Sequence, residues 1–246
     1  MDPSGLPFPS TGAREGGWER SAKAWIARQG ERGDWGRVAV LDPVMTELAC
    51  AAGGRFLDVG CGEGRFVRLL SARGLAGVGV DPVEALVATA RERDPRGDYR
   101  LARGEALPFG AHEFALVVFY LSLCDIPDLP AAIGEAARVL QPGGTLLIAN
   151  PSSINSAGQW QRNLLGRPLH YAVDDYMRER PVRLQWAGID IVNYHRPFSR
   201  YFEVLLGHGL ELRRFLEPLV HPSAAPKPKF DRVPNFVVME WQKPSA

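Results

Sequence analysis

The stretch FLDVGCGEG, residues 56–64, decides the fold. Its first four residues form a mostly apolar run with the length of a buried strand, and the glycines that follow permit a tight turn and close approach of the backbone to a ligand. A glycine-rich turn that leads into a helix is typical of ligand-binding strand–helix units. The dinucleotide pattern G-x-G-x-x-G requires glycine at position 65, where Arg65 stands, and the third glycine is Gly64 instead.

Two carboxylates indicate the chemistry of this turn. Asp58 ends the strand, where it repels a pyrophosphate but suits a cationic ammonium group such as that of S-adenosylmethionine. The alternative is a turn whose glycines serve packing alone. Asp81 ends the second strand, about twenty residues after the glycines, where an acidic side chain accepts hydrogen bonds from ribose hydroxyls. It can equally begin the helix that starts at Pro82, and the two roles can coexist.

Short apolar runs and helical periods alternate along the rest of the chain, which predicts a doubly wound α/β sheet. The expected strands are residues 55–59, 75–80, 99–102, 114–120, 145–150, 210–216 and 235–241. The expected helices are residues 63–73, 82–93, 129–140 and 199–207, with a turn at residues 141–144.

The domain organisation follows from where this alternation starts and breaks. Residues 1–17 are rich in Pro, Gly and Ser and are expected to form a flexible arm before a single domain, residues 18–246. We divide this domain into a helical lid (18–52), a cofactor-binding core (53–152), a substrate-side insertion (153–195) and a C-terminal helix with strands (196–246). In the insertion we expect a short helix near Ser156–Leu165, then two strands, residues 181–186 and 189–194.

Composition narrows the function classes. The chain has 246 residues and a net charge of +1, so the totals show no basic face for nucleic acid, although a local patch can hide in a balanced sum. Cys50, Cys61 and Cys124 are too few and too scattered for a disulfide framework or a zinc site. No apolar run approaches the roughly 20 residues that span a bilayer. These features predict a cytoplasmic monomer or homodimer with no metal, nucleic-acid or membrane partner.

Four motifs in this order carry a resemblance: FLDVGCGEG (56–64), GVGVD (77–81), ALPF (106–109) and ARVLQPGGTLLIA (137–149). Over about residues 50–152 the chain resembles the class I S-adenosylmethionine-dependent methyltransferases, in particular those with a type 11 methyltransferase domain. The resemblance implies a Rossmann-like seven-stranded sheet with an antiparallel last strand, S-adenosyl-L-methionine as cofactor, and methyl transfer to O, N or C. The cofactor residues that it implies are Asp58, Gly60, Cys61, Gly62, Asp81 and Pro82.

The chain departs from the family on the adenine side. Where the family often has an acidic residue followed by Ala, this chain has Arg103 and Gly104. Arginine carries no acceptor for the adenine amine. We therefore expect the adenine contacts to come from the backbone of Gly104 and Glu105, or from Glu105 and Ala106 through a shifted loop.

The acceptor is expected beyond the carboxyl ends of the fourth and fifth strands, the usual ligand crevice of open α/β sheets. Tyr120, which ends the fourth strand, is assigned to the cofactor side. An aromatic lid with Trp18, Trp25 and Trp35 suits a flat or apolar acceptor, although these side chains can also simply pack the helices onto the sheet. The candidate acceptor-binding residues are Trp25, Asp125, Asn150, Tyr171, Tyr194 and Arg196.

His195 is the candidate general base, because its pKa normally lies near neutrality and it follows the insertion at the same edge of the sheet. The alternative is that His195 and Arg196 anchor the insertion. The predicted function is methyl transfer to an O or N atom of a small molecule. The alternatives are a non-catalytic protein that binds S-adenosylmethionine or S-adenosylhomocysteine, an RNA or protein methyltransferase, and an NAD-linked oxidoreductase, which Arg65 and Asp58 disfavour.

Overall fold

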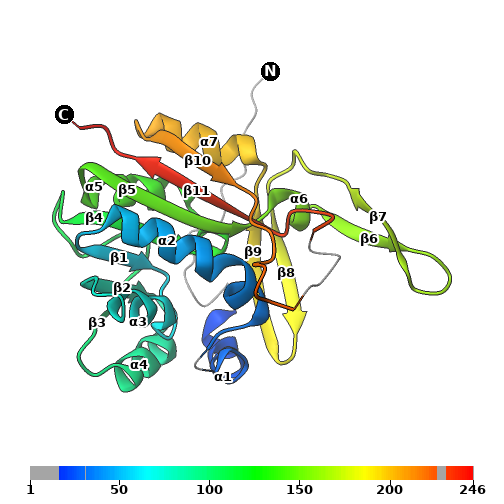
Figure 1. The fold of residues 1–246 in the computed structure, drawn as a ribbon, viewed down its shortest axis with the longest axis horizontal. Helices are drawn as coiled ribbons and strands as arrows, with labels where there is room; N and C mark the ends of the chain where they lie inside the picture. Colours follow the sequence, from blue (N-terminus) through cyan, green and yellow to red (C-terminus); the bar gives the residue numbers. More distant parts are fainter. Residues whose placement is uncertain (1–16, 31, 226–230, 246) are drawn as a thin grey trace.

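A seven-stranded sheet with the order β10-β11-β5-β4-β1-β2-β3 forms the centre of the molecule (Figure 1). The computed structural model describes residues 17–30, 32–225 and 231–245. The strands of this sheet are β1 (Phe56–Val59), β2 (Gly77–Asp81), β3 (Asp98–Leu101), β4 (Phe114–Tyr120), β5 (Leu140–Pro151), β10 (Glu211–Leu216) and β11 (Phe236–Gln242). The helices are α1 (Trp18–Gln29), η1 (Arg37–Leu41), α2 (Asp42–Ala52), α3 (Arg65–Ser71), α4 (Glu84–Arg93), η2 (Leu123–Asp125), α5 (Leu129–Val139), α6 (Ser153–Ser156) and α7 (Phe198–Gly207).

The direction of the strands confirms the doubly wound, Rossmann-like sheet. β1 to β5 run parallel, and β11 pairs antiparallel with both β5 and β10. The strand order reverses between β1 and β4. In such a sheet, ligands bind in the crevice at the carboxyl ends of the strands on either side of this reversal.

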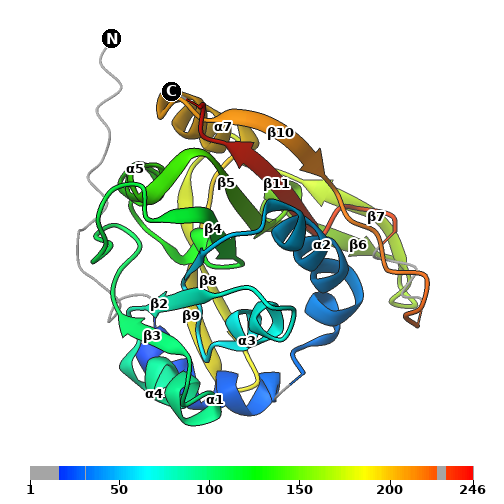
Figure 2. The ribbon, with the colours of Figure 1, turned by 60° about the vertical axis from the view of Figure 1, so that its left-hand side comes forward.

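Helices cover both faces of the sheet (Figure 2). One face carries α5 and α7, whose Ile133 and Leu205 pack with Val117 and Phe119 of β4. The opposite face carries α2, α3 and α4, which pack against the alternate residues of β4, among them Val118. Because successive side chains of a strand point to opposite faces, the near-continuous apolar run of β4 is what a strand buried on both faces requires.

β5 begins earlier than expected, directly after α5, so residues 141–144 belong to the strand and the predicted turn is wrong. The register between β4 and β5 shifts after Phe114, and this irregularity takes up the extra residues. Backbone hydrogen bonds of 2.9 Å join Gly143 and Gly144 to Lys243, which follows β11. These bonds draw the segment into the sheet.

The insertion after β5 consists of two β-hairpins. Its strands are β6 (Gly158–Arg162), β7 (Pro168–Val173), β8 (Arg180–Trp186) and β9 (Ile189–His195). The helix expected near Ser156–Leu165 is wrong, because residues 158–162 pair antiparallel with β7. The two strands expected at 181–186 and 189–194 are confirmed, and they are joined through Ala187 and Gly188, both with positive φ.

The lid begins at Gly17, which is buried and has a φ of 80°. A Cβ at this position would come within 2.1 Å of the carbonyl oxygen of Asp190 in β9. The residue that the sequence analysis placed at the end of a flexible arm is therefore packed against the insertion. The rest of that arm, residues 1–16, lies outside the described residues.

A matched pair of substitutions tests the packing of the sheet. A Cβ on Gly77 would come within 2.3 Å of the fully buried ring of Phe56, whereas a Cβ on Gly207 meets no atom within 4 Å. We expect Gly77→Ala to lower the free energy of unfolding by about 1–3 kcal/mol through overpacking. Gly207→Ala, at an exposed helix end, raises the free energy of unfolding by less than about 1 kcal/mol. Urea denaturation of both variants measures the difference, and equal effects would contradict this packing.

Candidate functional site

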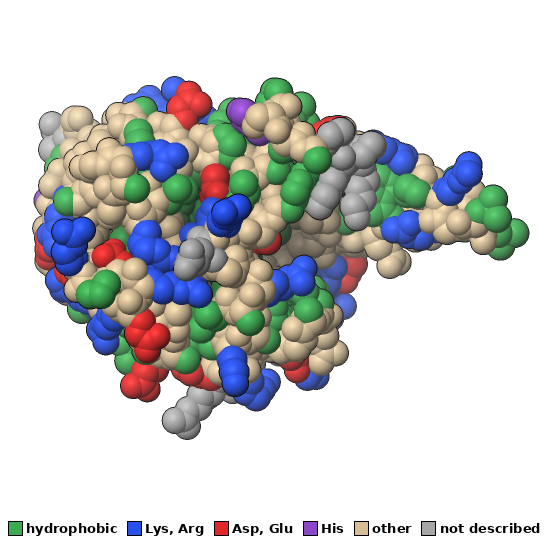
Figure 3. Space-filling model, turned by 60° about the horizontal axis from the view of Figure 1, so that its bottom comes forward, with side chains coloured by type: hydrophobic (Ala, Val, Ile, Leu, Met, Phe, Trp, Pro, Cys, Tyr) green, Lys and Arg blue, Asp and Glu red, His purple; other side chains and the backbone are tan. Residues whose placement is uncertain are grey.

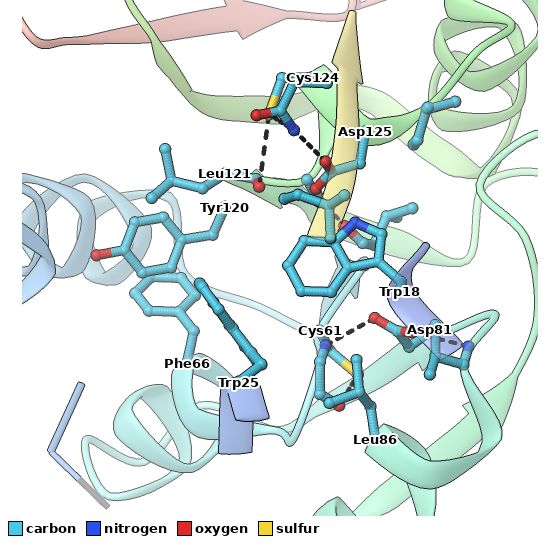
Figure 4. Close-up of a pocket in the computed structure, with 18 of the residues that line it drawn as sticks. Trp18, Trp25, Cys61, Phe66, Asp81, Leu86, Tyr120, Leu121, Cys124 and Asp125 are labelled. Carbon is cyan, nitrogen blue, oxygen red and sulfur yellow. Dashed lines mark hydrogen bonds between the residues drawn. The ribbon is translucent and has the colours of Figure 1, made fainter. Parts of the chain in front are cut away.

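A cavity of about 540 Å³ opens at the carboxyl ends of β1, β2 and β4, below the lid helix α1 and the β8–β9 hairpin (Figure 4). Most of the residues singled out from the sequence line it. They are Trp25, Asp58, Gly60, Cys61, Gly62, Asp81, Pro82, Gly104, Glu105, Tyr120, Asp125 and Tyr194.

The glycine turn between β1 and α3 forms the floor of the cavity. The amides of Gly60 and Cys61 both donate to the carbonyl oxygen of Val80, at 2.8 and 2.9 Å, which ties the turn to β2. Gly62 has a φ of 56° and a Cβ there would meet no atom within 4 Å. The backbone at Gly62 therefore borders open space, as close approach of a ligand requires.

Asp58 is the least compensated charge in this floor. Its side chain is 1% exposed, and Oδ1 has no hydrogen-bond partner among the described residues. Burial, with a smaller contribution from the nearby Asp81 carboxylate, raises the pKa of Asp58 to about 8. A cationic group in the cavity would reverse both effects by supplying a partner for the charged form. The ammonium group of an amino acid ligand is such a cation, and its contact with Asp58 stays a prediction.

Asp81 joins the glycine turn to the start of α4. Its Oδ2 accepts from the amide of Gly62 and its Oδ1 from that of Val83, both at 2.9 Å. Burial raises the pKa of Asp81 to about 6, although these two amides oppose the shift. The helix begins at Glu84 and not at Pro82, so Asp81 is not its N-cap but accepts from Val83, the residue before the helix. The side chain borders the cavity, and the ribose role stays a prediction.

Gly104 and Glu105, which the sequence predicts to contact the adenine, line one wall of the cavity. The Glu105 carboxylate pairs with Arg103 at 2.8 Å, which leaves it partly neutralised. Ala106 does not line the cavity, and its amide donates to the carbonyl oxygen of Arg103. The geometry therefore favours Gly104 and Glu105 over Ala106 for adenine contacts.

Aromatic side chains form the lid side of the cavity (Figure 4). The rings of Trp18 and Trp25 meet edge to face, with centroids 5.2 Å apart. The Arg37 guanidinium lies 4.9 Å from the centre of the Trp25 ring and forms an ion pair with Asp34. The hydroxyl of Tyr120 donates to Asp42 at 2.7 Å, so this ring is held in place by α2.

Asp125 is a further carboxylate that lines the cavity, and it is half-buried. It follows β4 in η2, and it accepts hydrogen bonds from the indole of Trp18 and the amide of Asn193. Burial raises the pKa of Asp125 to about 7, and these two donors partly offset the effect. One carboxylate thus joins the sheet, the lid and the β8–β9 hairpin at the cavity wall.

Comparison with known proteins shows which family the central part of the chain matches. The family model described as a methyltransferase domain matches residues 57–148. The chain is 30% identical over 173 residues to 27-O-demethylrifamycin SV methyltransferase of Amycolatopsis mediterranei, which is 63% of this chain and 63% of that protein. It is 27% identical over 177 residues to the phthiotriol/phenolphthiotriol dimycocerosates methyltransferase of Mycobacterium leprae, 68% of this chain and 66% of that protein. The chain therefore spans about two thirds of the length of these relatives.

The fold agrees with these matches. The crystal structure of an S-adenosylmethionine-dependent methyltransferase from Mesorhizobium loti superposes with a TM-score of 0.74 at 24% identity, covering 87% of this chain and 100% of that one. Residues 57–148 match the methyltransferase domain, and the S-adenosylmethionine-dependent proteins that share this fold imply S-adenosylmethionine as the cofactor. The partnerless Oδ1 of Asp58 and the open backbone at Gly62 fit that cofactor.

Several lining residues had no signal of their own in the sequence. Phe66 and Leu86 read as core positions of their helices, and Arg37 belongs to no recognisable motif. Only contacts between distant segments bring them to the cavity. Within residues 17–30, 32–225 and 231–245, no three His, Cys, Asp or Glu side chains lie close enough to hold a metal ion. None of the helices in the described segments has the length and apolar character that a bilayer crossing requires.

His195 lies outside the cavity, which corrects its expected place beside the acceptor. Its Nδ1 pairs with the hydroxyl of Ser156 at 2.6 Å, and its Nε2 with the carbonyl oxygen of Tyr176 at 2.8 Å. The side chain is buried, and this burial lowers the pKa of His195. A neutral ring that donates from Nε2 and accepts at Nδ1 satisfies both contacts, so His195 anchors the insertion.

Three other expected acceptor-binding residues also lie outside the cavity lining. The hydroxyl of Tyr171 donates within the insertion, to Asn155. The guanidinium of Arg196 donates to backbone carbonyls, including that of Ile126 at 2.6 Å, and so fixes the segment after β4. Asn150 is buried in β5, and its side-chain amide has no partner among the described residues.

We expect His195→Ala to lower the free energy of unfolding by about 1–3 kcal/mol, because Ser156 and Tyr176 lose their partner. The affinity for S-adenosylmethionine stays unchanged, since the ring does not border the cavity. The folded pKa of His195 lies below its unfolded value of about 6.5. The stabilisation is therefore present above that pH and is lost as the pH falls through the folded pKa.

Denaturation of wild type and variant at several pH values, with calorimetry of cofactor binding, measures both effects. His221→Ala, which removes an exposed imidazole, is the matched control. A stable His195→Ala protein with weakened cofactor binding would contradict the anchoring role.

Proposed function

We propose that the protein transfers the methyl group of S-adenosylmethionine to an O or N atom of a small, largely apolar molecule. One observation carries the proposal. A single cavity runs from the unpaired Asp58 carboxylate at the glycine turn to the Asp125 carboxylate under the aromatic lid. The first carboxylate suits the cofactor's amino acid part, and the second suits a hydroxyl or amine on the acceptor.

The residues on the cofactor side bind and orient. Asp58 accepts a hydrogen bond from the ammonium group, Gly62 allows the backbone to approach, and Asp81 accepts from ribose hydroxyls. When bound, S-adenosylmethionine supplies a methyl group already activated by its sulfonium charge. The remaining requirement is therefore to hold the acceptor atom in line and exclude water, which can account for much of the rate.

The residues on the acceptor side recognise the acceptor molecule and remove its proton. Trp18 and Trp25 offer apolar area for a flat or aliphatic acceptor. Asp125 accepts a hydrogen bond from the acceptor's O–H or N–H and takes the proton as the methyl group is transferred. With a pKa near 7, this carboxyl changes charge close to neutral pH, as a general base must. The relatives named above are methyltransferases whose names describe small organic acceptors, which supports this class of substrate.

Two alternatives are less well supported. A non-catalytic cofactor-binding protein predicts a plugged acceptor side, whereas this cavity extends to Trp186 and Asn193 of the insertion. An RNA or protein methyltransferase with an amide or base amine acceptor predicts an Asn/Asp-Pro-Pro-aromatic sequence after β4. Residues 120–123 read Tyr-Leu-Ser-Leu instead.

The proposed ammonium contact predicts pH-dependent cofactor binding. The folded pKa of Asp58 is about 8 without ligand, so binding to the charged form must first remove a proton at lower pH. We expect the affinity for S-adenosylmethionine to rise from about pH 6 to pH 8 by up to roughly tenfold per unit. In Asp58→Asn it is weaker and varies little over this range.

Calorimetry across this pH range measures the effect. 5′-Methylthioadenosine, which lacks the amino acid part, is the matched control and binds without this dependence. Equal pH profiles for the two ligands on the wild type would overturn the assignment of Asp58.

The proposed base predicts that Asp125→Asn loses turnover and keeps cofactor binding. We expect the rate of methyl transfer to fall by roughly 10²- to 10⁴-fold. The wild-type rate rises with pH through about 7, because the charged carboxylate is the active form, and the variant's residual rate lacks this rise.

Transfer from labelled cofactor to a panel of phenols, alcohols, carboxylic acids and amines measures these rates. Asn193→Ala removes a donor to Asp125 but leaves the carboxylate, so it retains most of the activity. Full activity in Asp125→Asn on the best acceptor would exclude the proton transfer.

A further inference from the structure

The β6–β7 hairpin projects from the body of the molecule, on the right in Figures 1 and 3. Its two strands form a sheet of their own, separate from the central sheet. A two-stranded hairpin is marginally stable in water by itself. Arg232 supports this hairpin through two contacts. Its guanidinium lies 4.6 Å from the centre of the Trp160 ring, and it donates a hydrogen bond of 2.7 Å to the carbonyl oxygen of Leu169. The hairpin plays no part in lining the cavity.

The tip of the hairpin presents two leucines to the solvent. Leu164 is 107% exposed and Leu165 is 80% exposed. Local hydrogen bonds organise the turn that carries them, because Oδ1 of Asn163 accepts from the amides of Leu165 and Arg167 at 3.0 and 2.9 Å. The exposure of the leucines is therefore a built feature of the turn. Two adjacent leucines at a projecting tip cost free energy in water unless a partner covers them.

The charge around the tip has one sign. Residues 153–173 contain Arg162 and Arg167 and no Asp or Glu. The Arg162 guanidinium donates to the carbonyl oxygen of Gly166 at 2.8 Å, which places this charge directly behind the leucines. Figure 3 shows basic side chains behind an apolar tip at the end of this projection. A partner that meets the tip thus encounters apolar and positive groups together.

Further apolar and aromatic groups lie along the hairpin. Leu169 and Val173 of β7 are 53% and 44% exposed. Trp160 and Tyr171 meet edge to face, with centroids 5.3 Å apart. From its tip towards the body of the molecule, the hairpin presents first leucines and then arginines and amphipathic aromatic rings. Leucines suit the hydrocarbon of a lipid leaflet, and arginines and aromatic rings suit its phosphates and polar interface.

We propose that the β6–β7 hairpin docks the protein on an anionic lipid bilayer, with Leu164 and Leu165 in the acyl region and Arg162 and Arg167 at lipid phosphates. A narrow convex tip offers little of the roughly 800 Å² that a stable protein interface buries on each partner. A bilayer needs no complementary shape, and anionic lipids attract each nearby basic side chain. The sequence predicted no membrane partner because no apolar run is long enough to span a bilayer, and surface docking by a projecting tip needs no such run.

Sedimentation of the full-length protein with vesicles tests the proposal. We expect binding to vesicles of phosphatidylglycerol and phosphatidylcholine at low salt, weaker binding at high salt, and little binding to phosphatidylcholine alone. Leu164→Asp with Leu165→Asp lowers the partition coefficient by roughly tenfold or more. Arg167→Gln lowers it by about fivefold on anionic vesicles. Leu206→Asp, at another leucine that is 57% exposed, is the matched control and binds as the wild type does.

Circular dichroism and cofactor affinity establish that each variant is folded, which is expected because the tip contributes nothing to the core. Wild-type protein that stays in the supernatant with anionic vesicles would overturn the proposal, as would undiminished binding of the double leucine variant. Sedimentation velocity without vesicles tests whether the tip instead binds a second copy of the chain. Self-association that the leucine variant abolishes, without vesicle binding, would assign the tip to a second copy of the chain instead. None of these outcomes depends on methyl transfer, so they leave the proposed function unaffected.

Discussion

The Asp58 carboxylate, buried at the end of β1 without a partner for Oδ1, is the constraint to which the rest of the site is adapted. Burying an unpaired charge costs several kcal/mol even after relaxation, so the free protein keeps this group largely protonated near neutral pH. A second carboxylate, Asp81, lies close enough to reinforce the effect. The fold tolerates the arrangement because the charge borders a cavity in which a cation can be received.

The topology of the sheet explains why the carboxylates share one cavity. β4, β1 and β2 are neighbours in the sheet and run parallel, so their carboxyl ends open at the same edge. Asp58 lies one residue before the end of β1, Asp81 ends β2, and Asp125 lies in the short 3₁₀ helix η2 that follows β4. Parallel pairing therefore converts residues far apart along the chain into one wall, and the reversal of strand order leaves that edge open to ligands.

The two hairpins of the insertion differ in what they contact. β9 is joined to the lid, since the hydroxyl of Ser21 donates to the carbonyl oxygen of Asp190 and accepts from its amide. The β8–β9 hairpin, whose Trp186 and Asn193 line the cavity, is thereby held against the lid, and His195 secures its end to Ser156 and Tyr176. The β6–β7 hairpin faces away from the cavity. The β8–β9 half of the insertion thus lines the cavity, and the β6–β7 half makes the membrane contact that we propose.

The sequence by itself determined the features encoded by consecutive residues. The β1 strand, its glycine turn and the carboxylates Asp58 and Asp81 follow from spacing along the chain, because a strand, a turn and a helix start depend mainly on local conformation. The alternation of apolar strands and helices determined the class of fold for the same reason. Tertiary structure decided what depends on contacts between distant segments. It turned His195 away from the cavity, brought Trp18 and Asn193 to Asp125, and made residues 158–162 a strand. Burial, partners and strand pairing belong to neighbours in space, and those neighbours exist only once the chain has folded.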